Sequence, residues 1–433
     1  MTEKFDAVVV GAGPAGATAA LVLAQAGVKV AIIERGETPG AKNMSGGALY
    51  YSEVLHKLVP DFWHEAPVER YITRRIITFL TPTASLSLDF KDTDFGHPPY
   101  NGFTLLRAKF DRWYAQKAQQ AGALLIPETV VDDLLWANGK VVGIKTRRDE
   151  GELYADVVIV ADGANSLLAE KAGLRNKTSP ADFAVAAKEL LALPRRTIEE
   201  RFNLSPEEGI ANEFVGSCTQ GIQGGAFLYT NKASISIGII ANLNRLRESK
   251  ISIAELLDSF KEHPALKELL KGAAIKEYSG HLLPEGGLKA MPKLYGDGVL
   301  LAGDAASLVY STGLVLEGMN FAIASGFAAA EAVKKARQDG DFSKKGLAYY
   351  ETLLNHSFVL KDLKNFRRTP GFLAKSRLYE LYPALACGIA NRLFRVDGQP
   401  RKRLLALVKD EMRGKISLSQ AVKDGIEAWR ALL

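Results

Sequence analysis

The chain has 433 residues, more than one hydrophobic core usually organises, so we expect two or three domains. Hydrophobic residues make up 47% of the sequence and charged residues 24%, with a net charge of +6, which is the balance of an ordinary globular protein. Its two cysteines, Cys218 and Cys387, exclude a cysteine-ligated zinc site or iron–sulfur cluster within the chain, and they give no basis for a disulfide framework.

The N-terminal segment has the pattern of a strand, a helix and a second strand. Residues 5–10 form a short apolar run, residues 14–26 have helical character up to Gly27, and residues 28–33 form another apolar run. This pattern predicts a βαβ unit. The chain runs directly into the first strand without the pattern of a signal peptide, so we expect no cleaved leader.

The turn of this unit reads Gly11-Ala12-Gly13-Pro14-Ala15-Gly16, which fits G-x-G-x-x-G. Gly11 permits the tight turn, Gly13 lets a diphosphate approach the backbone, and Gly16 lets the helix pack on the strand. The helix N-terminus then offers free N–H groups and a partial positive charge to the diphosphate. Glu34 ends the second strand and can accept hydrogen bonds from ribose hydroxyls. The alternative is a glycine turn in some other α/β fold.

The next elements extend the same domain. We expect a helix over 110–121 ending at Gly122, strands over 123–126 and 141–146, and a buried strand over 157–161 that ends at Asp162-Gly163.

The pattern changes after residue 182. Alternating runs over 226–229 and 233–240 predict an antiparallel sheet, and residues 253–270 predict a helix. Buried-strand character returns at 299–302, and a long helix of small residues is expected from about 316 to 336. The last ninety residues read as helices.

The strand at 299–302 ends in Gly303-Asp304 and is followed by small residues. Asp304 would therefore lie at the carboxyl end of a strand beside the dinucleotide, where its carboxylate can bind ribityl or ribose hydroxyls. A helix beginning beyond Gly313 would direct its positive end at a flavin ring and stabilise the anionic reduced form. These features in the second half of the chain favour FAD over NAD as the bound dinucleotide.

Three segments, GAGPAG at 11–16, ADGANS at 161–166 and LLAGDAA at 300–306, resemble in order and spacing the FAD-binding set of the glutathione-reductase-like flavoproteins, hydroxylase branch. Four more segments are similar to the FixC family, relatives of electron-transfer-flavoprotein:quinone oxidoreductase, and they lie at 40–50, 224–229, 283–287 and 318–326. The resemblance covers essentially the whole chain.

The resemblance implies further cofactor contacts. Lys42, Asn43, Ser45 and Gly46 match the loop against the isoalloxazine, and Arg107 matches an arginine near the cofactor. Val131 matches the adenine contact, while Gly313, Gly318 and Met319 match the segment near the flavin O2 edge. A surface cation is the alternative for Lys42 and Arg107. The full predicted cofactor-binding set is Gly11, Gly13, Pro14, Ala15, Gly16, Glu34, Arg35, Lys42, Asn43, Ser45, Gly46, Arg107, Val131, Ala161, Asp162, Gly163, Gly303, Asp304, Gly313, Gly318 and Met319.

The expected fold is therefore α/β, with a discontinuous, glutathione-reductase-like FAD-binding Rossmann domain of the hydroxylase branch. We expect this domain over 1–75, 100–180 and 290–345, and an inserted antiparallel sheet domain for substrate or quinone over 76–99 and 181–289. Residues 346–433 form a helical, basic C-terminal region.

By resemblance, the chain acts in a FixABCX-like complex. It would accept electrons from an electron-transfer flavoprotein with FixA/FixB-like subunits and pass them to quinone, with coupled reduction of ferredoxin or flavodoxin by electron bifurcation. The longer quinone oxidoreductases carry a C-terminal iron–sulfur domain whose cysteines are missing here, so a small ferredoxin-like, FixX-like chain is expected to supply the cluster. No side chain need act as acid or base, because the chemistry is centred on the flavin.

Two other functions stay open at this point. One is a geranylgeranyl-reductase-like prenyl reductase or an aromatic hydroxylase, with a small apolar molecule held over the flavin. The other is a non-catalytic scaffold subunit that carries FAD. A dedicated NAD(P)H domain is not expected, because no second G-x-G-x-x-G follows a strand. The six histidines have no metal-ligand spacing, so no metal site is expected.

From residue 356 onward the chain has 16 Lys and Arg against 7 Asp and Glu, a net +9. Such a surface could face anionic lipid, nucleic acid or an acidic partner, or be a solvated helical face. Nucleic acid is not expected, because no binding motif accompanies the charge. Residues 372–394 mix aromatic, leucine and basic residues, which fits either peripheral membrane contact or helix packing. No transmembrane helix is expected, so we predict a cytoplasmic protein, with contact to the inner face of the membrane as an open alternative.

Overall fold

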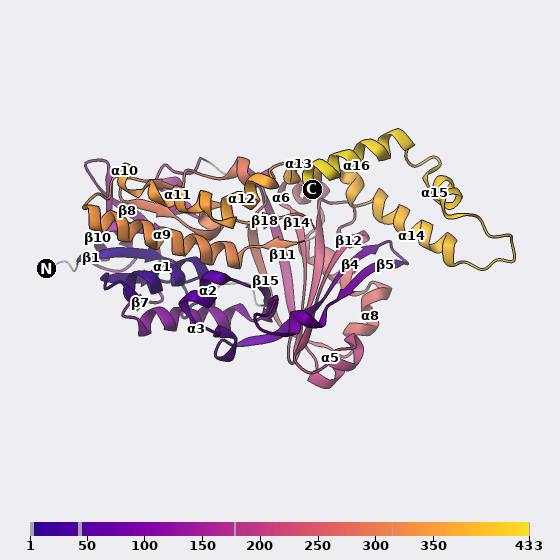
Figure 1. Ribbon diagram of the computed structural model, residues 1–433, viewed down its shortest axis with the longest axis horizontal. Coiled ribbons are helices and arrows are strands. Elements are labelled where there is room, and N and C mark those ends of the chain that lie inside the picture. The colour runs from indigo at the N-terminus through magenta and orange to yellow at the C-terminus, as the bar shows by residue number, and fades with distance from the viewer. Residues whose placement is uncertain (1–3, 42–45, 177–178, 314, 433) are drawn as a thin grey trace.

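The structure is a computed structural model that describes residues 4–41, 46–176, 179–313 and 315–432. Two large sheets form the body of the protein, and helices pack against each of them (Figure 1). Helices α14 (Leu381–Phe394) and α15 (Leu404–Met412) lie at the end of the molecule opposite the N-terminus (Figure 1).

The first sheet carries the dinucleotide motif. Its strand order is β16-β17-β10-β1-β2-β7, and β9 joins β10 and β8 at one side. The strands β17, β10, β1, β2 and β7 pair in parallel, as the two runs of the predicted βαβ unit require. The bounds are β1 Lys4–Val10, β2 Val30–Ile33, β7 Leu124–Ile126, β8 Val131–Ala137, β9 Lys140–Thr146, β10 Glu152–Val160, β16 Tyr295–Gly296 and β17 Val299–Leu301.

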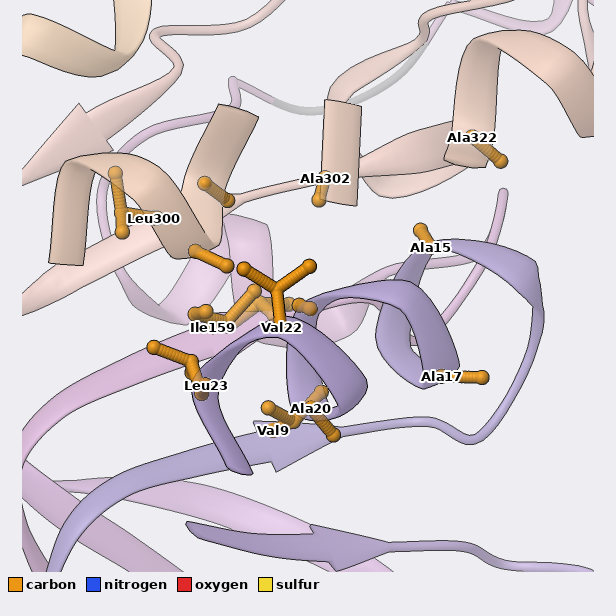
Figure 2. Close-up of a cluster of buried hydrophobic side chains, with 14 of the residues drawn as sticks. Val9, Ala15, Ala17, Ala20, Val22, Leu23, Ile159, Leu300, Ala302 and Ala322 are labelled. Carbon is orange, nitrogen blue, oxygen red and sulfur yellow. The ribbon is translucent and has the colours of Figure 1, made fainter. Parts of the chain in front are cut away.

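Helices α1 (Pro14–Gln25) and α9 (Met319–Asp339) pack against each other beside this sheet. Figure 2 shows side chains of α1 between Val9 of β1 and the segments that carry Leu300, Ala302 and Ala322. The contact depends on small residues, because a Cβ added to Gly326 of α9 would lie 2.1 Å from the Ala15 carbonyl oxygen. The two helices can therefore approach backbone to backbone beside the cofactor turn.

The second sheet has the order β15-β11-β14-β13-β12-β4-β6-β3, with β5 paired to β4. It is antiparallel except that β12 and β4 are parallel, so it is a mixed sheet. Strands β3 and β6 belong to it although they fall in ranges assigned to the FAD domain from the sequence, and so does the first part of β4. The bounds are β3 Gly47–Tyr50, β4 Val68–Leu80, β5 Ser85–Lys91, β6 Gly102–Leu105, β11 Phe183–Ala192, β12 Glu208–Gly216, β13 Gly224–Thr230, β14 Ser234–Asn242 and β15 Ala274–Pro284.

One face of the second sheet is covered by helices. Ile237 and Ile239 of β14 lie in a buried cluster with Leu257 and Phe260 of α7. The prediction of one helix over 253–270 is wrong, because the segment forms two helices, α7 and α8, on either side of His263. Pro264 begins the second helix, where it lacks the N–H that a continuous helix would need. The bounds here are α5 Arg195–Phe202, α6 Leu243–Ser249, α7 Ile253–Lys261 and α8 Pro264–Leu270.

The long helix that was expected to begin at about residue 316 begins instead at Met319. The residues before it form a small hairpin of β18 (Tyr310–Ser311) and β19 (Leu316–Glu317). The remaining helices are α2 Glu53–Leu58, α3 Arg107–Gln120, α4 Leu167–Lys171, α10 Lys344–Leu347, α11 Tyr349–His356, α12 Phe358–Asn365, α13 Thr369–Leu373, α14 Leu381–Phe394, α15 Leu404–Met412 and α16 Leu418–Leu432. Among the described residues, none of these helices combines the length and the apolar character needed to cross a membrane.

Helix α16 is fixed to the body through Asp424. Its carboxylate, with a 3% exposed side chain, accepts hydrogen bonds from Arg377 at 2.8 and 2.9 Å, from the Tyr382 hydroxyl at 2.7 Å and from Lys375 at 3.2 Å. The hydrogen bonds from Arg377 are the main cause that holds the pKa of Asp424 well below its usual value. The carboxylate therefore connects α16 to the segment before α14.

We predict that Asp424→Asn destabilises the protein by roughly 1–3 kcal/mol, because hydrogen bonds to a charged acceptor are lost in a buried position. The lowered pKa means that the stabilisation is present above the unfolded-state pKa and is lost as pH falls through the folded-state value. The difference in melting temperature should therefore be constant near neutral pH and shrink in acid. Glu200→Gln, which removes an exposed ion pair with Arg196, is the control and should change little. Equal melting temperatures for Asp424→Asn and wild type would contradict this role.

Candidate functional site

A large cavity lies between the two sheets, with a volume of about 730 Å³. The carboxyl ends of β1, β2 and β10 reach it from one side, and β11, β13, β14 and β15 of the second sheet cover it from the other. The predicted residues that line it are Gly11, Gly13, Pro14, Ala15, Glu34, Arg35, Gly46, Arg107, Val131, Ala161, Asp162, Gly163, Gly303, Asp304, Gly318 and Met319. The volume falls in the range of cofactor and ligand pockets.

Each glycine of the N-terminal turn has its own structural reason. Gly11 has φ +99°, and a Cβ there would lie 2.4 Å from the carbonyl oxygen of Ala161. A Cβ on Gly16 would lie 1.9 Å from the carbonyl oxygen of Gly11, so Gly16 serves the packing of helix on strand and does not line the cavity. A Cβ on Gly13 would meet nothing within 4 Å, so this position leaves open space before the N-terminus of α1. A diphosphate fits this space and the N–H groups of the helix.

Glu34 supports the turn as well as lining the cavity. Its carboxylate accepts hydrogen bonds from the N–H of Ala12 at 3.0 Å and the N–H of Gly36 at 2.7 Å. A carboxylate has about four lone-pair sites, so acceptor capacity remains for ribose hydroxyls. The acidic residue expected from the sequence thus also fixes the glycine loop.

Two carboxyl groups, those of Asp162 and Asp304, line the cavity. Burial raises the pKa of Asp162 to about 6, and the Asp162 Oδ1 atom has no hydrogen-bond partner. Burial also raises the pKa of Asp304 to about 6, although Arg107 and Arg175 oppose the shift. A buried acceptor without a partner costs free energy, so Asp162 Oδ1 fits a missing donor such as a cofactor hydroxyl.

Two arginines hold this part of the site. Arg107 donates two hydrogen bonds to Asp111, at 2.9 and 2.8 Å, so its guanidinium is fixed at the start of α3. Arg175, which the sequence analysis missed, donates to the carbonyl oxygens of Ala164 at 3.0 Å and Ala305 at 2.6 Å. Arg175 therefore ties the loop after β10 to the loop after β17.

Besides Gly16, four of the predicted residues are not placed at the cavity by the structure. Lys42, Asn43 and Ser45 fall outside the described residues. Gly313 has φ +79° but does not line the cavity, and a Cβ there would lie 2.7 Å from Leu373. Gly313 therefore packs against Leu373 of the C-terminal region.

The structure adds residues that the sequence analysis did not assign to the site. At the end near Glu34 and Val131 the additional lining residues are Thr129, Asp132, Arg147, Asn165, Ser166 and Lys171, and at the other end they include Lys188, Phe227, Tyr229, Ile240, His281, Leu283, Val309 and Leu316. The sequence analysis assigned residues 226–229 to a predicted strand and the segment 224–229 to the FixC resemblance, but not to the site. A sequence pattern that could have identified Lys188 as a site residue is the charged pair Lys188-Glu189 within an otherwise apolar strand.

The residues fit FAD. Open space at Gly13 faces a helix N-terminus, Asp162 Oδ1 has no hydrogen-bond partner, and Gly318 at the start of α9 has open space where a Cβ would be. Gly13 would lie at the diphosphate, Asp162 and Asp304 would bind hydroxyls, and Gly318 would lie at the ring edge. When bound, FAD supplies the electron-transfer chemistry. The fold and the site define an FAD-dependent oxidoreductase.

Comparison with known proteins gives the family. Residues 369–433 match the ETF-QO/FixC family C-terminal domain, and residues 5–194 match the family described as pyridine nucleotide-disulphide oxidoreductase. The chain is 44% identical to Protein FixC of Azotobacter vinelandii over 434 residues, covering 100% of both chains. It is 43% identical to Protein FixC of Escherichia coli K12 and 42% identical to the probable electron transfer flavoprotein-quinone oxidoreductase YdiS of the same strain, covering 99% of each chain. The chain belongs to the FixC family.

Among solved structures, a geranylgeranyl bacteriochlorophyll reductase-like protein from Thermoplasma acidophilum has a TM-score of 0.72 at 23% identity, covering 98% of this chain and 99% of that one. The flavin-dependent brominase Bmp2 has a TM-score of 0.62 at 15% identity, covering 99% of this chain and 94% of that one. These likenesses concern the fold alone.

We predict that Gly13→Val yields a folded protein that has lost FAD. The added side chain has room within the protein but occupies the space expected for the diphosphate. Affinity for FAD should fall at least about 10-fold, which corresponds to about 1.4 kcal/mol. The measurement is flavin content after purification, followed by titration of the apoprotein with FAD.

Gly425→Val on α16 is the matched control, since a Cβ at Gly425 also meets nothing within 4 Å and lies far along the chain from the site. Its flavin content should equal that of wild type. Full FAD occupancy in the Gly13→Val protein would show that the diphosphate does not lie at this turn.

Proposed function

We propose that this FAD-dependent oxidoreductase takes electrons from an electron-transfer flavoprotein and passes them to quinone. The observation that carries the proposal is an apolar chamber at the flavin end of the cavity, in a chain similar over its full length to FixC proteins and to YdiS. FixA/FixB-like subunits are the proposed electron donor. Coupled reduction of ferredoxin or flavodoxin by electron bifurcation belongs to the same proposal.

The chamber suits a quinone head group. Phe227 and Tyr229 stack at a centroid distance of 5.0 Å, and Leu283, Val309 and Leu316 complete an apolar wall. A planar ring with two carbonyl oxygens needs such walls together with a few hydrogen-bond donors. The polar side chains in this part of the cavity include Lys188 and His281 of the second sheet and Arg107 of α3.

The C-terminal segment supports a surface role. The tip between α14 and α15, residues 392–405, exposes Phe394, Val396 and Leu405 at 75%, 81% and 77%. The same tip contains four arginines and lysines in addition to Arg392, at 395 and 401–403, and all four are exposed. Figure 1 shows α14 and α15 projecting beyond the second sheet. We propose that the tip touches an anionic lipid surface, and that a small ferredoxin-like, FixX-like chain supplies the iron–sulfur cluster elsewhere on the protein.

The function is tested by anaerobic half-reactions with the purified holoprotein. The flavin absorbance should bleach on addition of a reduced electron-transfer flavoprotein, and it should return when a short-chain benzoquinone is added. Bleaching without recovery would contradict quinone as the acceptor. Recovery with oxygen and an aromatic compound that becomes hydroxylated, or with saturation of a prenyl chain, would establish the alternative enzyme class instead.

For the tip, we predict that Phe394→Glu with Leu405→Glu abolishes flotation with vesicles containing anionic lipid, because apolar insertion is lost and charge repulsion is added. Ile275→Glu, which changes a 59% exposed apolar residue on β15, should float like wild type. Flotation should also weaken at high salt, since exposed charges are screened. Unchanged flotation of the double variant would contradict the proposed membrane contact.

A further inference from the structure

Lys188 lies in the interior of the second sheet, on the face that covers the cavity. Lys188 is only 2% exposed, yet it lines the cavity. Its ammonium group therefore faces the site and not the bulk solvent. Burying an ammonium group is costly unless it is paired or hydrogen-bonded. Within the described residues, no carboxylate lies at ion-pair distance from it. Such a residue needs a reason to be there.

The contacts of Lys188 leave donor capacity unused. Its Nζ donates a hydrogen bond to the carbonyl oxygen of Gly46 and lies 5.2 Å from the ring centroid of Phe227 and 5.9 Å from that of Tyr229. Both rings offer a cation–π contact. An ammonium group has three N–H donors, and one is used by Gly46. The remaining donors lie in a cavity whose wall is apolar.

The surrounding sheet is built to allow this position. Gly238 is the register partner of both Lys188 and Phe227, and a Cβ on Gly238 would lie 2.4 Å from Phe227 Cζ. The glycine therefore lets the aromatic ring extend toward the lysine. Gly46 has φ +66°, and a Cβ there would lie 2.1 Å from Ser236 Oγ, so only glycine brings this carbonyl oxygen to Lys188. On the other side, Ser279 is the partner of Lys188 in β15, and its buried hydroxyl has no hydrogen-bond partner.

The charges that face Lys188 come from several elements. Burial is the main cause that lowers its pKa to about 7, the positive charge of Arg107 on α3 lowers it further, and Glu277 on β15 opposes the shift. Burial likewise lowers the pKa of His281 to about 4, with Arg107, Arg35 and Lys188 adding to it. His281 is therefore neutral near pH 7. Lys188 is the member of this group that can both carry a proton and give it up near neutral pH.

We propose that Lys188 is a catalytic residue that hydrogen-bonds a carbonyl oxygen of the quinone and donates a proton to that oxygen during reduction. The inference rests on the proposed function and adds to it a named proton donor. Reduction of a quinone to a quinol takes two electrons and two protons. When bound in its anionic reduced form, FAD would supply both electrons and one proton, and the Lys188 ammonium group would supply the second proton. Lys188 becomes a neutral amine, and solvent protonates it again once the quinol leaves.

The test isolates the second half-reaction. The holoprotein is reduced anaerobically with one equivalent of dithionite, mixed with a short-chain benzoquinone in a stopped-flow instrument, and followed by the return of flavin absorbance. Lys188→Met should slow reoxidation at saturating quinone by roughly 100-fold or more, the range for loss of a general acid. Lys188→Arg restores charge and hydrogen bonding but gives up its proton far less readily, so it should restore quinone affinity more than rate. Lys276→Met, at an exposed lysine on β15, should behave as wild type.

A second readout does not depend on any variant. In wild type the reoxidation rate should fall as pH rises past the pKa of Lys188, because the ammonium form is the proton donor. The negative charge of bound cofactor raises this pKa, so the fall should begin at or above about pH 7. The Met variant should lose this dependence.

The outcomes separate the two levels of the proposal. If reduced wild type is not reoxidised by the quinone, the proposed function fails. If wild type is reoxidised and Lys188→Met matches it in rate and in pH profile, the role of Lys188 is overturned while the function stands. If Lys188→Met does not fold, a wild-type rate that stays flat across the pH range overturns the role on its own.

Discussion

The structure depends on the approach of backbone to backbone where the first strand turns into α1. Gly11 lies against the carbonyl oxygen of Ala161, Gly16 against that of Gly11, and Gly326 lies against Ala15, each at a distance that a Cβ would make impossible. These contacts bring β1, β10 and α9 together at one point. Because no side chain fills the space in front of Gly13, the N-terminus of α1 is open to a diphosphate.

From that point the cavity extends between two sheets of different character. The parallel sheet is apolar on both faces and contributes mainly backbone and acidic groups at its carboxyl edge. The second sheet separates its two faces by alternation, with Ile237 and Ile239 toward the helices and Gly238 toward the cavity. The first sheet therefore serves the cofactor, and the second sheet forms the chamber in which a substrate would meet it. Lys188 lies on the cavity side of the second sheet, where its ammonium group donates a hydrogen bond to the carbonyl oxygen of Gly46 in the loop before β3.

Much of the cofactor site could be predicted because its signals are local. A glycine turn between a strand and a helix, an acid at the end of the second strand and a Gly-Asp pair at the end of a later strand each carry their meaning in a few neighbouring residues. The predicted residues from Gly11 to Met319 line the cavity, apart from Gly16, Gly313 and the three outside the described residues. Among the lining residues, Gly46, Arg107, Val131, Gly318 and Met319 were predicted from the family resemblance and not from a local pattern. The chamber was less predictable, because Lys188, Phe227 and His281 come from three strands, and strand pairing decides which side chains face inward. Helix ends were also hard to predict. The helical pattern alone did not show that one helix ends before Pro264, or that a hairpin precedes α9.

The central claim is that one FAD molecule occupies the cavity between the sheets, with its diphosphate at the start of α1. The most direct measurement is the flavin released from purified, heat-denatured protein, identified by chromatography and quantified against protein concentration. The account predicts one FAD per chain, either as purified or after incubation of the apoprotein with FAD. A protein that stays colourless after this incubation would contradict it.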